Sequence, residues 1–297
     1  MTSGILLVDK PDGMTSHDVV SRVRKLAGTR KVGHAGTLDP MATGLLILGL
    51  DSSTRLLTYL VGLDKEYLAT IQLGFATTTD DREGDQLGPA TDAAGIPDDR
   101  IVAAIAPLTG RIQQVPSSVS AIKVEGKRSY ARVREGEDVV LPAREVTVSA
   151  FEILERRGGA LDVRVECSSG TYIRALARDL GAALGVGGHL TALRRTRVGP
   201  FAVGEAGQLG EELMATQLGA ASVARRLFPV VELDADEVLQ LSQGKRIRPA
   251  RLGSELGNSA GPIAAVTTDG RLAGLIATTE GQARVLVNFP TGEVLEA

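Results

Sequence analysis

The segment from Lys31 to Leu50 constrains this chain more than any other, because it joins a glycine-rich turn to an apolar run. Glycine permits tight turns and close backbone approach that other residues resist. Asp39 lies at the tip of such a turn, directly before Pro40. A carboxylate in this position either caps a helix or faces a substrate. The choice between these two interpretations decides what the chain does.

The first interpretation is structural. Asp followed by Pro is typical of a helix start, with Asp39 as the N-cap and Pro40 as the first helical residue. The second interpretation rests on the surroundings of the turn. Gly36 and neighbouring small residues leave space in front of it, and His34 lies close by in the same glycine-rich stretch. An ionised aspartate exposed there could act as a nucleophile or a general base.

Composition places the chain among soluble globular proteins. Its 297 residues are 43% hydrophobic and 23% charged, which is ordinary for that class. No apolar stretch approaches the roughly 20 residues that span a bilayer, and the apolar segment near the N-terminus is too short for the core of a signal peptide. We therefore expect a cytoplasmic protein with no membrane partner.

The sequence predicts neither a metal nor a cofactor. Cys167 is the only cysteine, and the three histidines lack the paired spacing of a zinc motif. Neither the phosphate-binding loop of ATPases nor the glycine fingerprint of dinucleotide-binding proteins is present. Cys167 falls on the apolar side of an alternating segment, which predicts a small core residue.

Basic residues are clustered although the net charge is only −3. A basic face on an acidic body is compatible with binding to phosphate groups, although each cluster taken alone could equally be solvated surface. Four clusters stand out: Arg22 to Lys31, Lys123 to Arg134, Arg194 to Arg197, and Lys245 to Arg251.

Local patterns predict several elements. A helix is expected from Ser16, as a possible N-cap, to Gly28, and a second helix over 171–184. Strands are expected over 67–73, 144–154 and 161–167, and a short helix over 101–108. The segment 115–141 is polar, basic and without apolar periodicity, so we expect a mobile basic insertion there.

The character of the chain changes after Phe228. The residues Asp234 to Glu237 resemble a capping box that opens a short helix ending at Gly244. Three short strands follow, over 263–267, 272–277 and 284–289, and the first two are separated by a turn at Asp269 and Gly270. We therefore predict two domains, a larger one over 1–228 and a small β-rich one over 229–297.

Four blocks of sequence and one three-residue element resemble the TruB family of tRNA pseudouridine synthases. The block from Gly33 to Gly44 resembles the active-site signature of that family, and the block from Asp9 to Ser16 resembles its opening motif. Asp64 to Tyr67 and Cys167 to Arg174 resemble two further motifs, and Leu193 to Arg195 matches a Leu-Arg-Arg element. The tail resembles the PUA RNA-binding domain more weakly.

The resemblance implies an α+β protein with the pseudouridine synthase fold. In that fold a central mixed, mostly antiparallel sheet is flanked by helices and loops, and here a small PUA-like domain would follow. It also implies an isomerase that needs no cofactor and converts uridine to pseudouridine at position 55 in the T-loop of tRNA. The glycosidic bond breaks, the base turns, and it rejoins the sugar through C5. Whether the aspartate acts at C6 of the base or at the sugar stays open.

The resemblance also assigns roles to individual residues. Asp39 matches the catalytic aspartate, and Arg174 matches the arginine that pairs with it. Tyr67 matches the tyrosine that stacks on the flipped base, which recovers part of the cost of leaving the RNA stack. Tyr172 and Leu193 match walls of the pocket. In addition, His34 matches a histidine that helps to hold the RNA in its rearranged conformation around the flipped base.

The expected partner is the T-stem-loop of tRNA, bound by a protein that we expect to be a monomer. The basic residues expected to contact RNA are Lys123, Lys127, Arg128, Arg194 and Arg195. The alternative function is a non-catalytic module that binds or folds tRNA through the same basic face. A guide-RNA-dependent relative is disfavoured by the short length and by the lack of a lysine-rich tail. One departure from the family is Val119, where an aromatic residue is usual.

Overall fold

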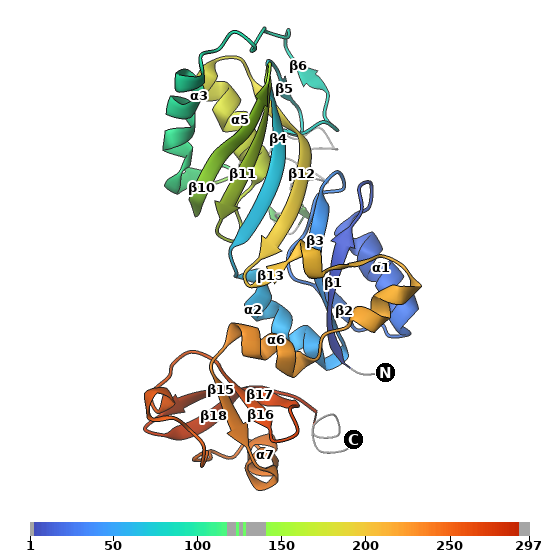
Figure 1. Ribbon diagram of the computed structural model, residues 1–297, viewed down its shortest axis with the longest axis vertical. Coiled ribbons are helices and arrows are strands. Elements are labelled where there is room, and N and C mark those ends of the chain that lie inside the picture. Colours follow the sequence, from blue (N-terminus) through green and yellow to red (C-terminus); the bar gives the residue numbers. More distant parts are fainter. Residues whose placement is uncertain (1–2, 118–122, 125–126, 129–140, 291–297) are drawn as a thin grey trace.

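The computed structural model describes residues 3–117, 123–124, 127–128 and 141–290 (Figure 1). Two short strand pairs are separate from the larger sheets. They are β5 (Ala76–Thr77) with β6 (Gln86–Leu87), and β8 (Lys123–Val124) with β9 (Lys127–Arg128). Most of the basic insertion predicted over 115–141, including Val119, lies outside the described residues.

A large mixed sheet forms the main body of the described chain. Its order is β14-β1-β3-β12-β4-β11-β10-β7, with β2 paired to β3 and β13 paired to β12. Only the β1–β14 and β3–β12 pairs are parallel, so the expectation of a mixed, mostly antiparallel sheet is confirmed. The ten strands are β1 (Gly4–Lys10), β2 (Val32–His34), β3 (Thr43–Leu50), β4 (Lys65–Leu73), β7 (Gly110–Gln114), β10 (Arg144–Arg157), β11 (Ala160–Cys167), β12 (Gly188–Val198), β13 (Phe201–Ala202) and β14 (Gly207–Gln208).

The junction of β3 with β12 divides this sheet into two halves, which Figure 1 shows as separate groups of strands. Only two residue pairs join the strands there, Arg194 with Thr43 and Arg195 with Gly44. Gly44 has a φ of +98°, and a Cβ atom on it would lie 2.3 Å from the carbonyl oxygen of Arg195. The close approach of the two strands therefore requires glycine at this position.

The apolar run in the opening segment becomes a strand that is buried on both faces. In β3, Leu46 and Leu48 join one hydrophobic cluster, whereas Leu45 and Ile47 join another on the opposite face. Strands covered on both sides carry continuous rather than alternating apolar residues. The described helices that cover the sheets are α1 (Ser16–Ala27), α2 (Leu57–Val61), α3 (Asp98–Ile105), α5 (Ile173–Leu184), α6 (Ala220–Leu227) and α7 (Ala235–Ser242).

Helix α1 agrees with its prediction except at its first residue. Gly28 ends the helix, as predicted, and it does so in the left-handed conformation. The N-cap is Thr15 rather than Ser16, and it forms a reciprocal capping box with Asp18. Ser16 is instead buried, and its hydroxyl bonds to both the backbone amide and the backbone carbonyl of Leu38. The amide of Leu38 donates to the hydroxyl at 2.8 Å, and the hydroxyl donates to its carbonyl at 3.1 Å.

The C-terminal part of the described chain forms a separate four-stranded sheet in the order β15-β16-β17-β18. Its strands are β15 (Val230–Leu233), β16 (Ile263–Thr267), β17 (Leu272–Thr279) and β18 (Gln282–Asn288). The predicted capping box opens α7 at Asp234, and Gly270 turns the β16–β17 hairpin with a φ of +86°. Helix α6 lies between this sheet and β1 (Figure 1).

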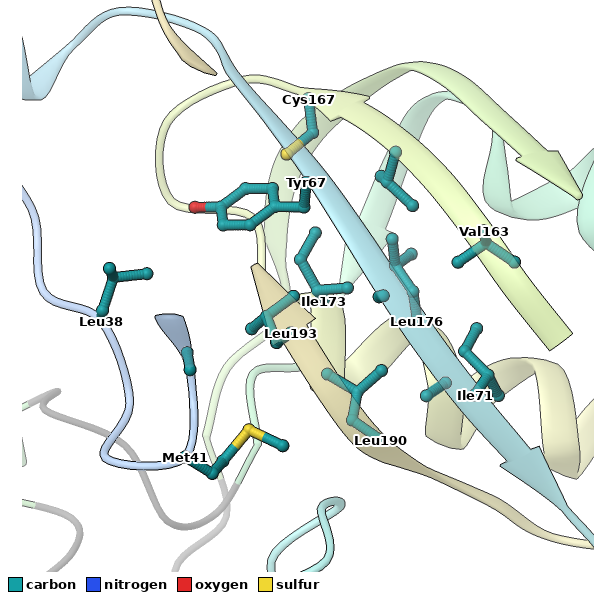
Figure 2. Packing of buried hydrophobic residues seen from close by; sticks show 14 of the residues in the cluster. Leu38, Met41, Tyr67, Ile71, Val163, Cys167, Ile173, Leu176, Leu190 and Leu193 are labelled. Atoms are coloured by element: carbon teal, nitrogen blue, oxygen red, sulfur yellow. The ribbon is translucent and has the colours of Figure 1, made fainter. Parts of the chain in front are cut away.

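The predicted strands near the site are also present. Strand β4 begins two residues before the predicted start at Tyr67, and β11 covers the predicted range. The side chain of Cys167 is 1% exposed, so its interpretation as a core residue is confirmed. Helix α5 presents Leu176 and Leu180 to the same core as β4 (Figure 2). This packing fixes the start of α5 against the sheet, close to the β3–β12 junction.

Candidate active site

Asp39 lies in a tight turn that leads into β3. The amide of Ala42 donates to the carbonyl of Asp39 at 3.1 Å, and β3 begins one residue later, at Thr43. The helix-start interpretation of Asp39 and Pro40 is therefore wrong, because no helix follows the turn. The sequence Met-Ala-Thr-Gly continues directly into a strand whose apolar residues are needed in the core of the sheet.

Buried side chains hold this turn at several backbone carbonyls. Arg195 donates from Nη2 to the carbonyl of Gly36 at 3.1 Å and from Nε to that of Leu45 at 2.7 Å. The ammonium of Lys10 donates to the carbonyl of Pro40 at 3.1 Å. Together with the bonds from Ser16 to Leu38, these contacts fix the backbone on both sides of Asp39. The position of its carboxylate is thus determined by the fold.

The Asp39 carboxylate forms a two-pronged ion pair with Arg174, the second residue of α5. Nε of Arg174 donates to Oδ2 at 3.0 Å, and Nη2 donates to Oδ1 at 3.0 Å. The arginine side chain is only 4% exposed, whereas that of Asp39 is 32% exposed. A buried guanidinium in this fork geometry orients a carboxylate through two charge-assisted hydrogen bonds. The exposed part of Asp39 remains available to a substrate.

A second carboxylate, that of Asp81, shares the same guanidinium. Its Oδ2 lies 3.4 Å from Nη1 of Arg174, and its side chain is 4% exposed. Oδ1 of Asp81 accepts bonds from the hydroxyl of Thr79 at 2.5 Å and from the amide of Glu83 at 3.0 Å. Asp81 belongs to the acidic loop, residues 80–85. Sequence reasoning missed it, because such a loop gives no local sign of which carboxylate turns inward.

The exposed side of Asp39 opens into a cavity of about 280 Å³. Besides Asp39, five of the residues singled out from the sequence line this cavity: Arg174, Tyr67, Tyr172, Leu193 and Arg195. Figure 2 shows the ring of Tyr67 projecting from β4 toward the segment that carries Leu38, with Leu193 beside it. An ionised carboxylate next to a flat ring and an apolar wall suits a planar, polar ligand such as a nucleobase.

Burial perturbs two titratable groups on the wall of the cavity. It raises the pKa of the Tyr67 phenol, which therefore stays protonated at neutral pH. Burial lowers the pKa of Lys65 to about 8. The ammonium of Lys65 donates to the carbonyls of Val61 at 2.6 Å and Leu63 at 2.5 Å. Lys65 was not predicted as a site residue, and these bonds hold the end of α2 at the edge of the cavity.

Arg195 lies on the wall of the cavity. Its side chain is 1% exposed and bonds to carbonyls of the turn before Asp39 and of β3. These bonds support the backbone around Asp39, and the expected contact of Arg195 with RNA stays a prediction. Arg194 points the other way, forms a two-pronged pair with Asp9 at 2.8 and 3.0 Å, and is 40% exposed. A role of Arg194 in RNA binding stays a prediction.

His34 is not among the residues that line the cavity. It ends β2, opposite Leu48 of β3, and burial lowers the pKa of its imidazole. The ring is therefore predominantly neutral at pH 7, and its expected contact with RNA stays a prediction. The side chains of Lys123, Lys127 and Arg128 lie outside the described part of the chain, so their expected phosphate contacts also stay predictions.

The described residues contain neither a candidate metal cluster nor a candidate membrane-spanning helix. No group of three or more His, Cys, Asp or Glu side chains in this part of the chain is placed to hold a metal ion. None of the helices found there combines the length and apolar character needed to cross a bilayer.

Comparison with known families accounts for almost the whole chain. Residues 24–173 match the family described as TruB family pseudouridylate synthase (N terminal domain). Residues 174–232 match the tRNA pseudouridylate synthase B C-terminal domain, and residues 228–290 match the C-terminal part described for tRNA pseudouridine synthase II. The first match contains Asp39 and Tyr67, and the second begins at Arg174.

Individual relatives agree with the family matches. A protein of Leifsonia xyli subsp. xyli named tRNA pseudouridine synthase B is 60% identical, and the alignment covers 98% of each chain. An Arthrobacter protein of the same name is 57% identical over 99% of each chain. Among solved structures, a chain of an H/ACA RNP bound to a substrate RNA containing 2'-deoxyuridine superposes with a TM-score of 0.72 at 25% identity. That superposition covers 98% of this chain and 86% of the other.

Proposed function

This chain belongs to the TruB family of pseudouridylate synthases, and on that premise we propose that Asp39 catalyses the reaction at position 55 in the T-loop of tRNA. The chain is an isomerase that converts uridine to pseudouridine in tRNA. The observation that carries the assignment to Asp39 is its two-pronged pair with buried Arg174, inside a cavity that Tyr67 also lines.

The chemistry requires a charged acid group beside an extruded uracil. The bond from N1 of the base to C1′ of the ribose breaks, the base turns, and C5 bonds to C1′. The proton on C5 leaves to solvent, and N1 gains a proton, so no redox partner is needed. Arg174 holds the Asp39 carboxylate through two hydrogen bonds and aims it into the cavity.

Extrusion of the target base from its loop costs a few kcal/mol. We assign the recovery of part of this cost to Tyr67, because one stacked base contributes about 1–3 kcal/mol. The ring of Tyr67 extends from β4 into the cavity, and Tyr172 and Leu193 supply other parts of the wall. The raised pKa of Tyr67 keeps its ring uncharged, which suits contact with a neutral base.

We propose that the T-stem-loop of tRNA binds across this cavity. We also propose that the protein acts in the cytoplasm. Residues 229–297 act as a PUA-like RNA-binding domain, and residues 1–228 carry the catalytic site. Exposed basic side chains after α7, namely Lys245, Arg246 and Arg248, support the first assignment. A monomer is supported because the large exposed apolar side chains of the described residues, such as Val102 and Leu239, lie on different elements.

The deciding experiment replaces Asp39 with asparagine. Unmodified tRNA transcript labelled with tritium at C5 of uridine releases the label when pseudouridine forms, and mapping of the product locates the modified position. We expect wild-type protein to modify position 55 and Asp39→Asn to release no label while it still binds tRNA. Full turnover by Asp39→Asn would falsify the assignment.

The matched control is Asp162→Asn. Asp162 also pairs with an arginine, Arg157, at 2.6 Å and accepts a bond from the hydroxyl of Thr70 at 2.7 Å, but it does not line the cavity. This variant should keep wild-type turnover. If both variants and the wild type bind tRNA and none of them modifies it, the chain is a non-catalytic tRNA-binding module.

A further inference from the structure

We propose that Gln114 and Arg178 are positioning residues for the reaction, and this inference rests on the proposed function. Gln114 ends β7, and Arg178 lies one helical turn after Arg174 on α5. Neither residue lines the cavity. Together they connect the end of β7 to two segments. One is the start of α5, which carries Tyr172, and the other is the acidic loop, which carries partners of Arg174.

Gln114 holds the backbone at the start of α5. Its side-chain Nε2 donates to the carbonyl of Tyr172 at 3.0 Å, and the amide of Tyr172 donates to its Oε1 at 2.8 Å. Tyr172 is the N-cap of α5 and makes no capping bond with its own side chain. The Gln114 side chain is buried, with 2% of the residue exposed. The side chain of Gln114, from another element, thus bonds to both the backbone amide and the backbone carbonyl of the N-cap residue Tyr172.

Arg178 makes three contacts from one guanidinium. Nη2 donates to the carbonyl of Val115 at 2.7 Å, directly after Gln114. Nη1 lies 3.3 Å from Oδ2 of Asp80, and Nε donates to Oδ1 of Asp179 at 2.8 Å. An arginine fork suits this role because its donors are held in one plane at fixed angles. It connects α5, the end of β7 and the acidic loop.

The acidic loop is the segment through which Arg178 reaches the active site. Asp80 stands between Thr79, whose carbonyl accepts a bond from Nη1 of Arg174 at 2.9 Å, and Asp81, whose carboxylate pairs with the same nitrogen. Asp80 has a φ of +60°, a strained conformation for a residue with a side chain. The pair with Arg178 holds this strained residue in place.

These contacts therefore fix the backbone segments around the ion pair of Asp39 and Arg174. Gln114 fixes the position of the start of α5, where Tyr172 and Arg174 lie. Arg178 fixes the position of the acidic loop, which bonds to Nη1 of the Arg174 guanidinium. A misplacement of about 1 Å at reacting groups can lower a rate about a hundredfold. Loss of either tie should therefore lower the rate of the chemical step more than the affinity for tRNA.

The test measures single-turnover formation of pseudouridine and the dissociation constant for tRNA in the full-length protein. The variants are Arg178→Gln, Asp80→Asn and Gln114→Glu. The last keeps the size of the side chain but turns an oxygen toward the Tyr172 carbonyl. We expect the rate constant to fall about tenfold or more in each, with the dissociation constant within about twofold of wild type. The double variant Asp80→Asn/Arg178→Gln should be no slower than Arg178→Gln alone.

The matched control is Arg156→Gln. Arg156 also bonds backbone carbonyls, those of Ala93, Ala94 and Gly158, and pairs with Asp98, but it lies away from the cavity. This variant should keep the wild-type rate. The inference is overturned if the rates of the three test variants match that of Arg156→Gln, or if their loss lies in tRNA affinity alone. Absence of pseudouridine with wild-type protein would instead refute the proposed function.

Discussion

Arg174 links two carboxylates of different exposure, so its removal should affect stability and catalysis through different partners. In Arg174→Met, the volume of the side chain is largely kept, but Asp81 loses its cation while it stays only 4% exposed. Removing one member of a buried ion pair costs about 3–5 kcal/mol. Asp81 keeps its bonds from Thr79 and Glu83, so we expect the low end, about 3 kcal/mol of unfolding free energy.

A second substitution separates the two effects. In Arg174→Met/Asp81→Asn the buried charge is gone, and the asparagine oxygen can still accept the bonds that Oδ1 of Asp81 accepts. We therefore expect this double variant to regain about half of the lost unfolding free energy, because a neutral buried amide costs less than an unpaired charge. Turnover should remain roughly a hundredfold below wild type, since Asp39 still lacks the group that orients it.

Urea unfolding and single-turnover kinetics measure the two quantities in the same preparations. Affinity for tRNA, measured in parallel, should change only modestly in both variants. The reasoning is refuted if Arg174→Met is as stable as wild type, or if the added Asp81→Asn change restores turnover along with stability. Either result would mean that the buried carboxylate and the exposed one do not depend on Arg174 in the way the distances indicate.

Three other predictions concern the supporting structure. Gly44→Ala should lower the unfolding free energy by about 2 kcal/mol or more, because its Cβ would collide with the Arg195 carbonyl at a positive φ; Gly62→Ala, with open space around it, is the control in urea unfolding. Burial lowers the pKa of Lys10 from 10.5 to about 8, so the unfolded chain binds more protons between these values and stability from this group rises with pH across that window. Lys10→Met should lack this rise between pH of about 8 and 10.5, and an equal rise in both proteins contradicts the assignment. Burial raises the pKa of the Cys167 thiol to about 11, so iodoacetamide should label it at pH of about 8 only after denaturation, as mass spectrometry can show.

Elements that depend on neighbouring residues were predictable from the sequence. Helix α1 carries its own stop signal in Gly28, and α7 carries its capping box from Asp234 to Glu237. The choice of Thr15 over Ser16 as N-cap was not predictable, because Ser16 is drawn to a distant partner, Leu38. Adjacent hydroxyl residues look equivalent until tertiary contacts decide between them.

Prediction from local sequence has the same limit at the active site, where the residues that meet are far apart in the chain. Motif resemblance identified Asp39, Tyr67 and Arg174, and the structure brings these three to one cavity. Local propensity alone favoured a helix after Asp39, and tertiary burial of β3 overrode it. The inward turn of Asp81 and the burial of Arg195 depend on strands and loops far away in the chain, so local sequence pattern could not reveal them.

The narrow contact between β3 and β12 has a consequence for biosynthesis. Asp39 comes from one side of that contact, and its arginine comes from the other, 135 positions later in the chain. During translation the acid group therefore emerges long before the cation that orients it. Enzymatic turnover in a nascent or truncated chain would thus report that both halves had been completed and docked, which spectroscopic measures of secondary structure alone do not.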